Sequence, residues 1–315
     1  MSAPRSTIWP AEPHTVAKHA ILQGYLEAWF PILSAGHGKL VYVDGFAGPG
    51  RYSNAEDGSP IIALKVAVNH RARLSSQLAF IFVEEREDRA AWLRDHEIPA
   101  LKLPAHFKTF VRHGQFAPVL QRALDNLDAK KLHMAPTFAF IDPFGISGVP
   151  FSLIERLLRR QYCETLITFM TLAVQRFVTE LPGHVNELIG NQNAARIIEQ
   201  SQDRVLTARV LYEQSLRRVV RFVRFFQLRD TSHQPIYDLF FATNHTTGHE
   251  RMKEAMWKVD ASGAYSFSDG ADPNQRTLFS PQPGDDLAPL LWNHFRGRTV
   301  YTDEVYRHVA DTAYL

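Results

Sequence analysis

The stretch that decides the fold is KLVYVDGFAGPGR, residues 39–51. Its residues 40–43 form an apolar run with β-branched or aromatic side chains at three of four positions, which is typical of a strand buried on both faces. Gly45, Gly48 and Gly50 follow, and glycine permits positive φ and a close approach of a ligand to the backbone. Because ligands of α/β sheets bind outside the carboxyl ends of the strands, the loop predicts a nucleotide-like site.

The loop lacks the two common phosphate-binding motifs, G-x-G-x-x-G and G-x-x-x-x-G-K-[ST]. Its pattern D-x-F-A-G-x-G resembles motif I of S-adenosylmethionine (SAM) dependent methyltransferases, in the F-x-G-x-G form common among nucleic-acid amino-methylating enzymes. The resemblance implies that Gly45, Gly48 and Gly50 cradle the methionine part of SAM, with Asp44 and Phe46 as further cofactor contacts. The alternative is a glycine-rich turn that binds nothing.

The composition is that of an ordinary globular protein. The 315 residues suggest one large domain with additions, or two domains, and 45% apolar with 22% charged residues is typical of a soluble protein. The single cysteine, Cys163, excludes a disulfide framework within one chain and favours a reducing, cytoplasmic setting. No apolar run reaches membrane-spanning length, so no membrane partner is expected. The net charge of +2 means that a nucleic-acid partner must be recognised by a local basic patch.

Two further predicted strands end in candidate cofactor contacts. The apolar run 78–83 ends at Glu84, and an acid at the end of the second strand can accept both hydroxyls of a ribose. Its alternative role is to begin a charged, acidic helix. The predicted strand 107–113 precedes Gln115 and Phe116, where methyltransferases usually contact adenine. Gln115 would then bond the adenine edge and Phe116 would pack on the ring, while a plain turn is the rival interpretation.

The fourth predicted strand, 137–141, ends in the sequence D-P-F-G. This resembles the Asp/Asn-Pro-Pro-aromatic motif of amino-methyltransferases, in which the acid or amide accepts the target N–H and the aromatic ring stacks on the extruded base. The second proline is missing, and the form is closer to that of tRNA guanine N2-dimethyltransferases. The resemblance implies that Asp142 orients or deprotonates the acceptor beside the cofactor, that Phe144 packs on the acceptor, and that Pro143 and Gly145 line the substrate site. The alternative is an aspartate in a turn.

The chain is predicted to divide into four parts. Residues 1–13 form a flexible arm, and 14–268 form a Rossmann-like domain with a helical insertion at about 171–230. A Pro- and Gly-rich linker covers 269–286. The rest, 287–315, is a helical tail that resembles the start of a winged helix.

Other candidate contacts lie outside these motifs. Lys18, on a predicted helix over 15–33, is a candidate substrate contact, and this helix either packs on the sheet or closes over the methionine end of SAM. Asn244 and His245 follow a predicted strand and are candidates to contact substrate. His245 and His249 are four residues apart, but no H-E-x-x-H helix is present, so no metal is expected.

The stretch from residue 217 to 229 interleaves five arginines with aromatic and branched residues. Such a stretch can hold phosphates and stack bases. The equally weighted alternative is a strand or helix whose arginines are solvated.

Taken together, these motifs resemble the three-Cys-motif partner protein (TcmP) family of Rossmann-like methyltransferase relatives, over about residues 14–310. The matching pieces are KHxILxxYLxxWFPIL (18–33), DGFAGPG (44–50), GSP (58–60), FIDPFG (140–145) and FATNH (241–245), followed by Met252 and Met256-Trp257. The resemblance implies a SAM site and a partner protein that bears a three-cysteine motif. It does not supply a substrate.

The sequence therefore predicts a seven-stranded α/β sheet that binds SAM and methylates a nucleobase or nucleoside group in RNA, DNA or a nucleotide. One alternative is O-methylation of a small molecule or sugar hydroxyl, which needs a general base, and His245 is the candidate. The other alternative is a non-catalytic SAM- or nucleotide-binding partner of a three-Cys-motif protein.

Overall fold

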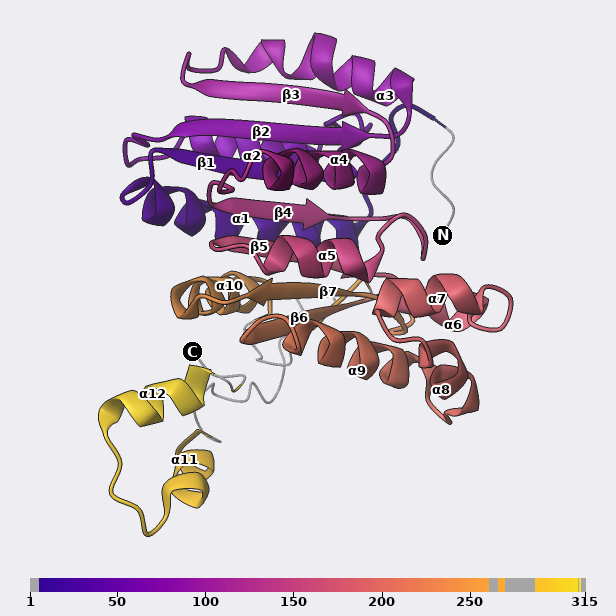
Figure 1. The fold of residues 1–315 in the computed structure, drawn as a ribbon, viewed down its shortest axis with the longest axis vertical. Coiled ribbons are helices and arrows are strands. Elements are labelled where there is room, and N and C mark those ends of the chain that lie inside the picture. The colour runs from indigo at the N-terminus through magenta and orange to yellow at the C-terminus, as the bar shows by residue number, and fades with distance from the viewer. Residues whose placement is uncertain (1–5, 261–265, 270–286, 311, 313–315) are drawn as a thin grey trace.

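A mixed eight-stranded sheet organises the chain (Figure 1). The computed structural model describes residues 6–260, 266–269, 287–310 and 312. The strand order is β3-β2-β1-β4-β5-β7-β6-β8. The strands are β1 Lys39–Asp44, β2 Gln77–Glu84, β3 Phe107–His113, β4 Thr137–Ile141, β5 Cys163–Phe169, β6 Phe222–Arg229, β7 Pro235–Thr243 and β8 Ser266–Ser268. The predicted α/β class is confirmed, but the predicted count of seven strands is wrong because β6 was not recognised.

Strand direction divides the sheet into two edges. Strands β1 to β5 are mutually parallel, whereas β7 pairs antiparallel with both β5 and β6. We call the edge at the carboxyl ends of β1–β5 the carboxyl edge, and the opposite one the amino edge. The chain turns to one side of β1 for β2 and β3 and to the other side for β4 and β5, so the topological switch point lies between β1 and β4.

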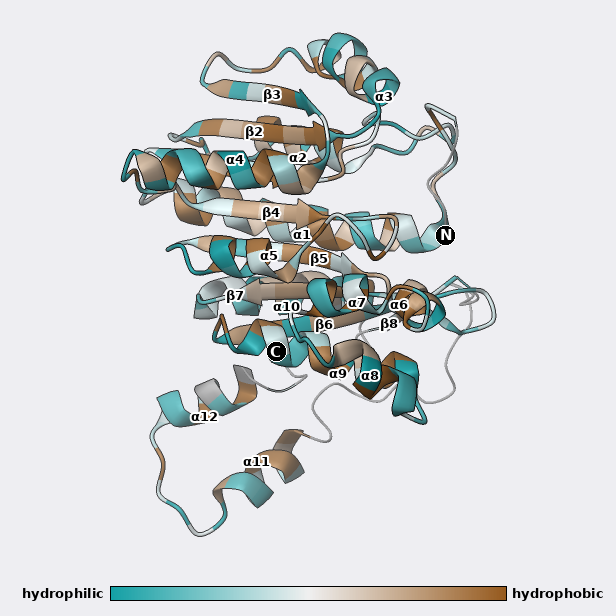
Figure 2. Cartoon of the chain, turned by 45° about the vertical axis from the view of Figure 1, so that its right-hand side comes forward, coloured by the Kyte–Doolittle hydropathy of each residue, from teal (hydrophilic) through white to brown (hydrophobic). Residues whose placement is uncertain are grey.

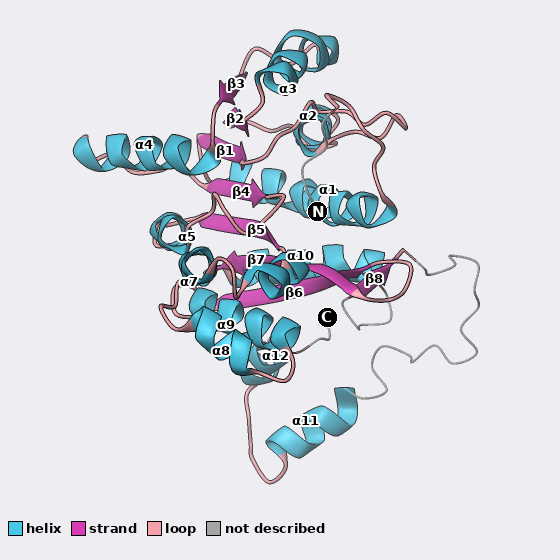
Figure 3. Ribbon diagram, turned by 90° about the vertical axis from the view of Figure 1, so that its right-hand side faces the viewer, coloured by secondary structure: helices cyan, strands magenta, loops and turns pink. Residues whose placement is uncertain are grey.

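Helices cover both faces of the sheet (Figure 3). On one face lie α1, α2 and α10, and on the other lie α4, α5, α7 and α9. This double cover explains why every residue of β4 and β5 is buried. The helices are α1 Pro13–Ser34, α2 Ser59–Val68, α3 Glu87–Trp92, α4 Phe116–Ala129, α5 Phe151–Leu158, α6 Thr171–Phe177, α7 Pro182–Ile189, α8 Ala194–Gln200, α9 Arg204–Arg217, α10 Thr246–Val259, α11 Leu287–Phe295 and α12 Thr302–Ala310.

Hydrophobic residues concentrate in the strands, whereas hydrophilic and hydrophobic residues alternate along α4 (Figure 2). Of α4, only Phe116, Leu120 and Leu124 are buried, at spacings of four residues that keep them on one side. Tyr42, Phe80 and Phe138 stack or tilt against one another across β1, β2 and β4. No described helix is long and apolar enough to cross a membrane.

The predicted helical insertion ends earlier than expected. Helices α6 to α9 fill residues 171–217, but 222–229 form strand β6 in register with β7. Two arginines of the stretch bind within the chain: Arg217, at the end of α9, pairs with Glu213, and Arg229, the last residue of β6, donates to the carbonyl of His233. The basic-aromatic stretch is therefore mainly a strand of the sheet. The predicted linker, 269–286, lies outside the described residues apart from its first one.

Candidate cofactor and substrate site

Three predicted site residues meet at the carboxyl edge. Asp44 is the last residue of β1, Glu84 is the last residue of β2, and Asp142 directly follows β4. Because β1 lies between β2 and β4 in the sheet, the three carboxylates come from neighbouring strands around the switch point. The position is the one where α/β sheets bind their ligands.

Asp44 is fully buried at this edge. One carboxylate oxygen accepts from the N–H of Phe46 at 3.3 Å, and the hydroxyl of Tyr42 donates to the other at 3.4 Å. Burial raises the pKa of Asp44 to about 7, with a smaller upward contribution from the charge of Asp142, while hydrogen bonds from Ser59, Phe46 and Tyr42 pull it down. Near neutral pH this carboxyl group is therefore poised to ionise when a cation arrives.

The glycines of the loop have different roles. A Cβ at Gly45 would lie 2.8 Å from the ring of Phe116, and one at Gly50, whose φ is +84°, would lie 2.7 Å from Leu93. These two glycines are needed for packing inside the protein. Gly48, with φ of +62°, meets only the indole of Trp9, at 3.6 Å from where a Cβ would stand. Gly48 is thus the glycine of the loop that has free space beside its Cα, on the side away from the core.

Glu84 fastens the loop to β2. Its Oε2 accepts from the N–H of Gly48 at 2.8 Å, and its Oε1 accepts from the N–H of Arg86 at 2.9 Å. Each carboxylate oxygen has two acceptor sites, so both keep capacity for a further donor. The predicted contact of Glu84 with a ribose stays a prediction, and these bonds set where such a ribose would lie.

Asp142 and Lys18, predicted separately, are bound to each other. The Nζ of Lys18, on α1, lies 2.5 Å from Oδ2 of Asp142. Lys18 is buried and lies 5.1 Å from the ring centre of Tyr237, whereas the Asp142 side chain is 22% exposed. The ion pair ties α1 to the end of β4 and leaves Asp142 partly open to a ligand.

The rest of the D-P-F-G loop runs from buried to exposed. Pro143 is buried, while Phe144 is 38% exposed and its ring lies 6.3 Å from that of Trp9. A Cβ at Gly145 would meet nothing within 4 Å, so there is open space beside the backbone. The accessible ring of Phe144 next to Asp142 is the surface on which a planar acceptor could stack.

The two predicted adenine contacts, Gln115 and Phe116, lie in different surroundings. Gln115 is exposed and its amide donates to Glu85 at 2.8 Å. Phe116 is buried beneath the glycine loop, with its ring 5.7 Å from that of Phe46. Phe116 therefore supports the loop, and Gln115 lies at the surface beyond Glu84.

The N-terminal arm contributes residues that were missed from the sequence. Trp9 lies against the guanidinium of Arg89, 4.3 Å from its ring centre, and edge-on to Tyr52 at 5.6 Å. The carbonyl of Trp9 accepts from the N–H of Ser53 at 2.9 Å, and Ala11 exchanges two hydrogen bonds with Asn54. Residues 6–13, the described part of the predicted arm, thus pack across the glycine loop. The adjacent apolar residues Ile8 and Trp9 in this arm were the available signal.

His19 is a second residue that was missed. It follows Lys18 on α1, is buried, and its ring lies 5.8 Å from that of Tyr52. Burial, and then the charge of Lys18, lower the pKa of His19 to about 3 against the opposing effect of Asp142. The imidazole is therefore neutral at physiological pH and adds no charge to the site.

The expectation that His245 and Asn244 join these residues is wrong. Ile141, Ile167 and Phe240 lie side by side, and β7 then runs in the opposite direction. His245 consequently lies at the amino edge, roughly 20 Å from Asp142 at about 3.3 Å per residue. There the side-chain oxygen of Asn244 accepts from the N–H of Arg221, the residue directly before β6. His249 lies within α10. Within the described residues, no group of three or more His, Cys, Asp or Glu could hold a metal ion.

Comparison with known proteins yields distant structural likenesses. Neither a protein-family model nor a curated protein sequence matches the chain. Among solved structures the chain is similar to Trm1 from Pyrococcus horikoshii in complex with S-adenosyl-L-methionine, at 9% identity and a TM-score of 0.40 over 82% of this chain. It spans 62% of that Trm1 chain.

Two further likenesses are weaker. A candidate methyltransferase from Porphyromonas gingivalis W83 is 12% identical with a TM-score of 0.33, over 72% of this chain and 41% of the other. A possible exported protein from Bordetella parapertussis is 12% identical with a TM-score of 0.33, over 74% and 70%. TM-scores this low carry no functional assignment, so the assignment below rests on the site.

Proposed function

We propose that the chain is a SAM-dependent methyltransferase that modifies an amino group of a nucleobase or nucleoside, in RNA, DNA or a nucleotide. One observation carries the proposal: Asp44, Glu84 and Asp142 converge beside the glycine loop at the carboxyl edge. The three carboxylates lie at the carboxyl ends of β2, β1 and β4, and the switch point, where a nucleoside-containing ligand is expected, lies between β1 and β4.

The charges at this edge suit SAM, whose positive sulfonium and ammonium groups outweigh its single carboxylate. Three carboxylates face two buried cations, Lys18 and Arg89. Asp44, with its pKa near 7, gains a partner when a cation binds beside it. The open side of Gly48 and the remaining acceptor sites of Glu84 fit a backbone approach and a ribose. When bound, SAM supplies a methyl group already activated at the sulfonium.

The residues of the chain then act by positioning. Lys18 holds Oδ2 of Asp142, which leaves Oδ1 to accept an N–H of the acceptor amine. Buried Pro143 fixes the turn, and the exposed ring of Phe144 stacks on the base. Alignment of the amine with the methyl group is the main source of rate acceleration in such a site.

The Lys18–Asp142 ion pair also favours a second candidate function. Because Lys18 already partners the carboxylate, the site would serve equally in a non-catalytic protein that binds SAM or a nucleotide and acts with a three-Cys-motif partner. The O-methylation alternative loses its proposed base, since His245 lies at the other edge of the sheet.

Two assays separate these functions. Calorimetry measures SAM binding, and radiolabelled SAM measures methyl transfer to total RNA, DNA and free nucleosides. Binding with transfer to RNA or DNA supports the proposal, and transfer to free nucleosides alone removes polymers as substrates. Binding without transfer to any of them supports the partner protein. Absence of SAM binding contradicts the methyltransferase, and absence of binding to both SAM and nucleotides contradicts the partner protein.

A further inference from the structure

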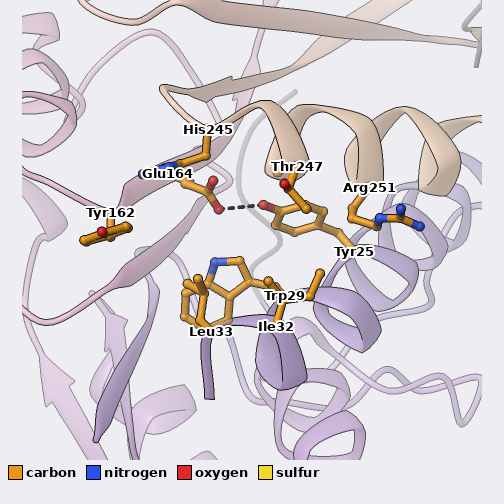
Figure 4. A pocket seen from close by; sticks show the side chains of 10 residues that line it. Tyr25, Trp29, Ile32, Leu33, Tyr162, Glu164, His245, Thr247 and Arg251 are labelled. Carbon is orange, nitrogen blue, oxygen red and sulfur yellow. Dashed lines mark hydrogen bonds between the residues drawn. The ribbon is translucent and has the colours of Figure 1, made fainter. Parts of the chain in front are cut away.

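The polar groups buried in a cavity at the amino edge satisfy one another (Figure 4). The cavity has a volume of about 150 Å³ and lies between α1 and α10. Its carboxylate, Glu164, accepts from the hydroxyl of Tyr25 at 2.5 Å and from that of Thr243 at 2.6 Å, and the indole nitrogen of Trp29 is turned toward it. The surface that is equipped for a partner lies instead on β3, the strand at one end of the sheet.

Strand β3 carries three exposed side chains on one face, Lys108, Phe110 and Arg112. The ring of Phe107 lies 5.8 Å from that of Phe80, and Phe80 packs on α1. Because side chains alternate along a strand, the three exposed ones point to the opposite face, which is the face of α4. Helix α4 packs against β2. The three side chains of β3 therefore stay open to solvent beside it.

The aromatic member of this row is the unusual one. Phe110 is 41% exposed, and the guanidinium carbon of Arg112 lies 5.6 Å from its ring centre. A lysine such as Lys108 is common on an edge strand, where it discourages pairing with another chain. That protection does not call for an exposed phenylalanine. A ring on which a base can stack, flanked by cations that can hold phosphates, is the combination that binds single-stranded nucleic acid.

Helix α4 adds a third cation to the same surface. Val119 lies 3.8 Å from where a Cβ of Gly114 would stand, so this flank of α4 is next to the end of β3. Arg122, three residues further on, lies on the same flank and is exposed. Among the described residues, Lys108, Arg112 and Arg122 form no ion pair. Three positive charges thus face solvent without an acidic partner.

We propose that the β3 patch, formed by Lys108, Phe110, Arg112 and Arg122, binds single-stranded nucleic acid. One base stacks on Phe110, and the three cations contact phosphates. Strand β3 ends at the carboxyl edge two residues before Gln115, so a nucleic-acid strand lying along it leads to the proposed SAM site. A single nucleotide cannot extend along the seven residues of β3, which span about 20 Å. The substrate class is therefore a polymer.

The binding of a strand stands on the patch alone, whereas its use as the methylated substrate rests on the proposed function. Fluorescence anisotropy with a fluorescein-labelled oligouridylate of about 12 nucleotides measures the binding. We expect a dissociation constant on the order of 1–100 μM at low salt. The logarithm of the association constant should fall with the logarithm of salt concentration with a slope of about −2, since each of three phosphate contacts contributes about −0.7.

Variants of the patch separate stacking from charge. Phe110→Leu keeps an apolar side chain and should weaken binding about fivefold or more at an unchanged salt slope, whereas Phe110→Tyr keeps the ring and should bind like the wild type. Lys108→Gln combined with Arg112→Gln should reduce the slope to about −0.7. The matched control is Lys258→Gln on α10, an exposed lysine on the other face of the sheet, which should leave the slope unchanged.

Three results overturn the proposal. The first is oligouridylate binding that is absent or that survives both Phe110→Leu and the double glutamine change. The second is equal or tighter binding of the duplex with oligoadenylate, whose paired bases cannot stack on Phe110. The third is equally effective competition by polyglutamate, which would indicate an acidic polypeptide as the partner. Calorimetry with SAM keeps the two proposals apart, because oligouridylate binding without SAM binding supports the patch and contradicts only the methyltransferase.

Discussion

The two edges of the sheet present different chemistry built on the same strands. The carboxyl edge gathers three carboxylates, an ion pair and a glycine loop, and the N-terminal arm covers it. The amino edge holds one carboxylate in an aromatic cavity. Strand direction decides at which edge a residue lies. The five parallel strands all end at the carboxyl edge, whereas β7 runs in the opposite direction and places His245 at the amino edge. A residue that follows a strand is therefore a candidate for a site only once the direction of that strand is known.

The largest expected effect at the carboxyl edge comes from Asp142→Ala. Loss of the group that orients the acceptor should reduce methyl transfer at saturating SAM about 100-fold or more, a larger effect than the weaker SAM binding that follows from loss of one carboxylate. Single-turnover assays with radiolabelled SAM measure the first quantity and calorimetry the second.

Asp142→Asn is the matched control, because it keeps an acceptor oxygen and a partner for the buried Lys18. It should retain much more transfer than the alanine variant. An alanine variant that is as active as the wild type would remove Asp142 from the mechanism.

Asp44 should make stability depend on pH. Its pKa is raised to about 7 by burial, so between about pH 4 and pH 7 the folded state binds more protons than the unfolded state. The free energy of unfolding must then fall as pH rises through this range, by about 1.4 kcal/mol per unit of pKa difference, a few kcal/mol in total. Urea unfolding at pH 5 and pH 7 should show this decline in the wild type and a shallower one in Asp44→Asn. Equal slopes would show that Asp44 is already charged.

The sequence predicts the carboxyl edge well because its signals are local. Asp44, Glu84 and Asp142 each end an apolar run, and parallel strands bring such ends together. Strand β6 was missed because its arginines interrupt the alternation of apolar residues. Its five-residue connection to β7 would have indicated an antiparallel pair, since parallel strands need crossovers of a dozen or more residues. The placement of His245 followed from that omission.

The amino edge could not have been predicted in the same way. Trp29, Glu164 and Arg251 come from three distant segments, and each fits an ordinary helix or strand pattern. Only the packing of α1 against α10 brings them to one cavity.

A smaller effect is expected from Trp9, which covers the open side of Gly48. Trp9→Ala should raise both the association and the dissociation rate of SAM, each by about three- to tenfold, because the arm no longer has to part from Arg89 and Tyr52. Stopped-flow fluorescence measures both rates, with Trp92→Phe as a control for the loss of a tryptophan. Rates equal to those of the wild type would show that the arm does not gate the site.

The smallest effect is expected from His245→Ala, which tests whether the two edges act independently. His245→Ala should leave methyl transfer and SAM affinity within about twofold, since the side chain is roughly 20 Å from Asp142. A strong loss of methyl transfer would couple the two edges.

The central claim is that the carboxyl edge binds SAM, and calorimetric titration with SAM tests it most directly. The account predicts one site per chain in the wild type. Glu84→Ala should weaken binding about 10- to 100-fold through loss of charged hydrogen bonds to the ribose. Glu87→Ala, which removes an exposed acid three residues further on, should not change it. No heat of binding in the wild type, or equal affinity in Glu84→Ala, would contradict the claim.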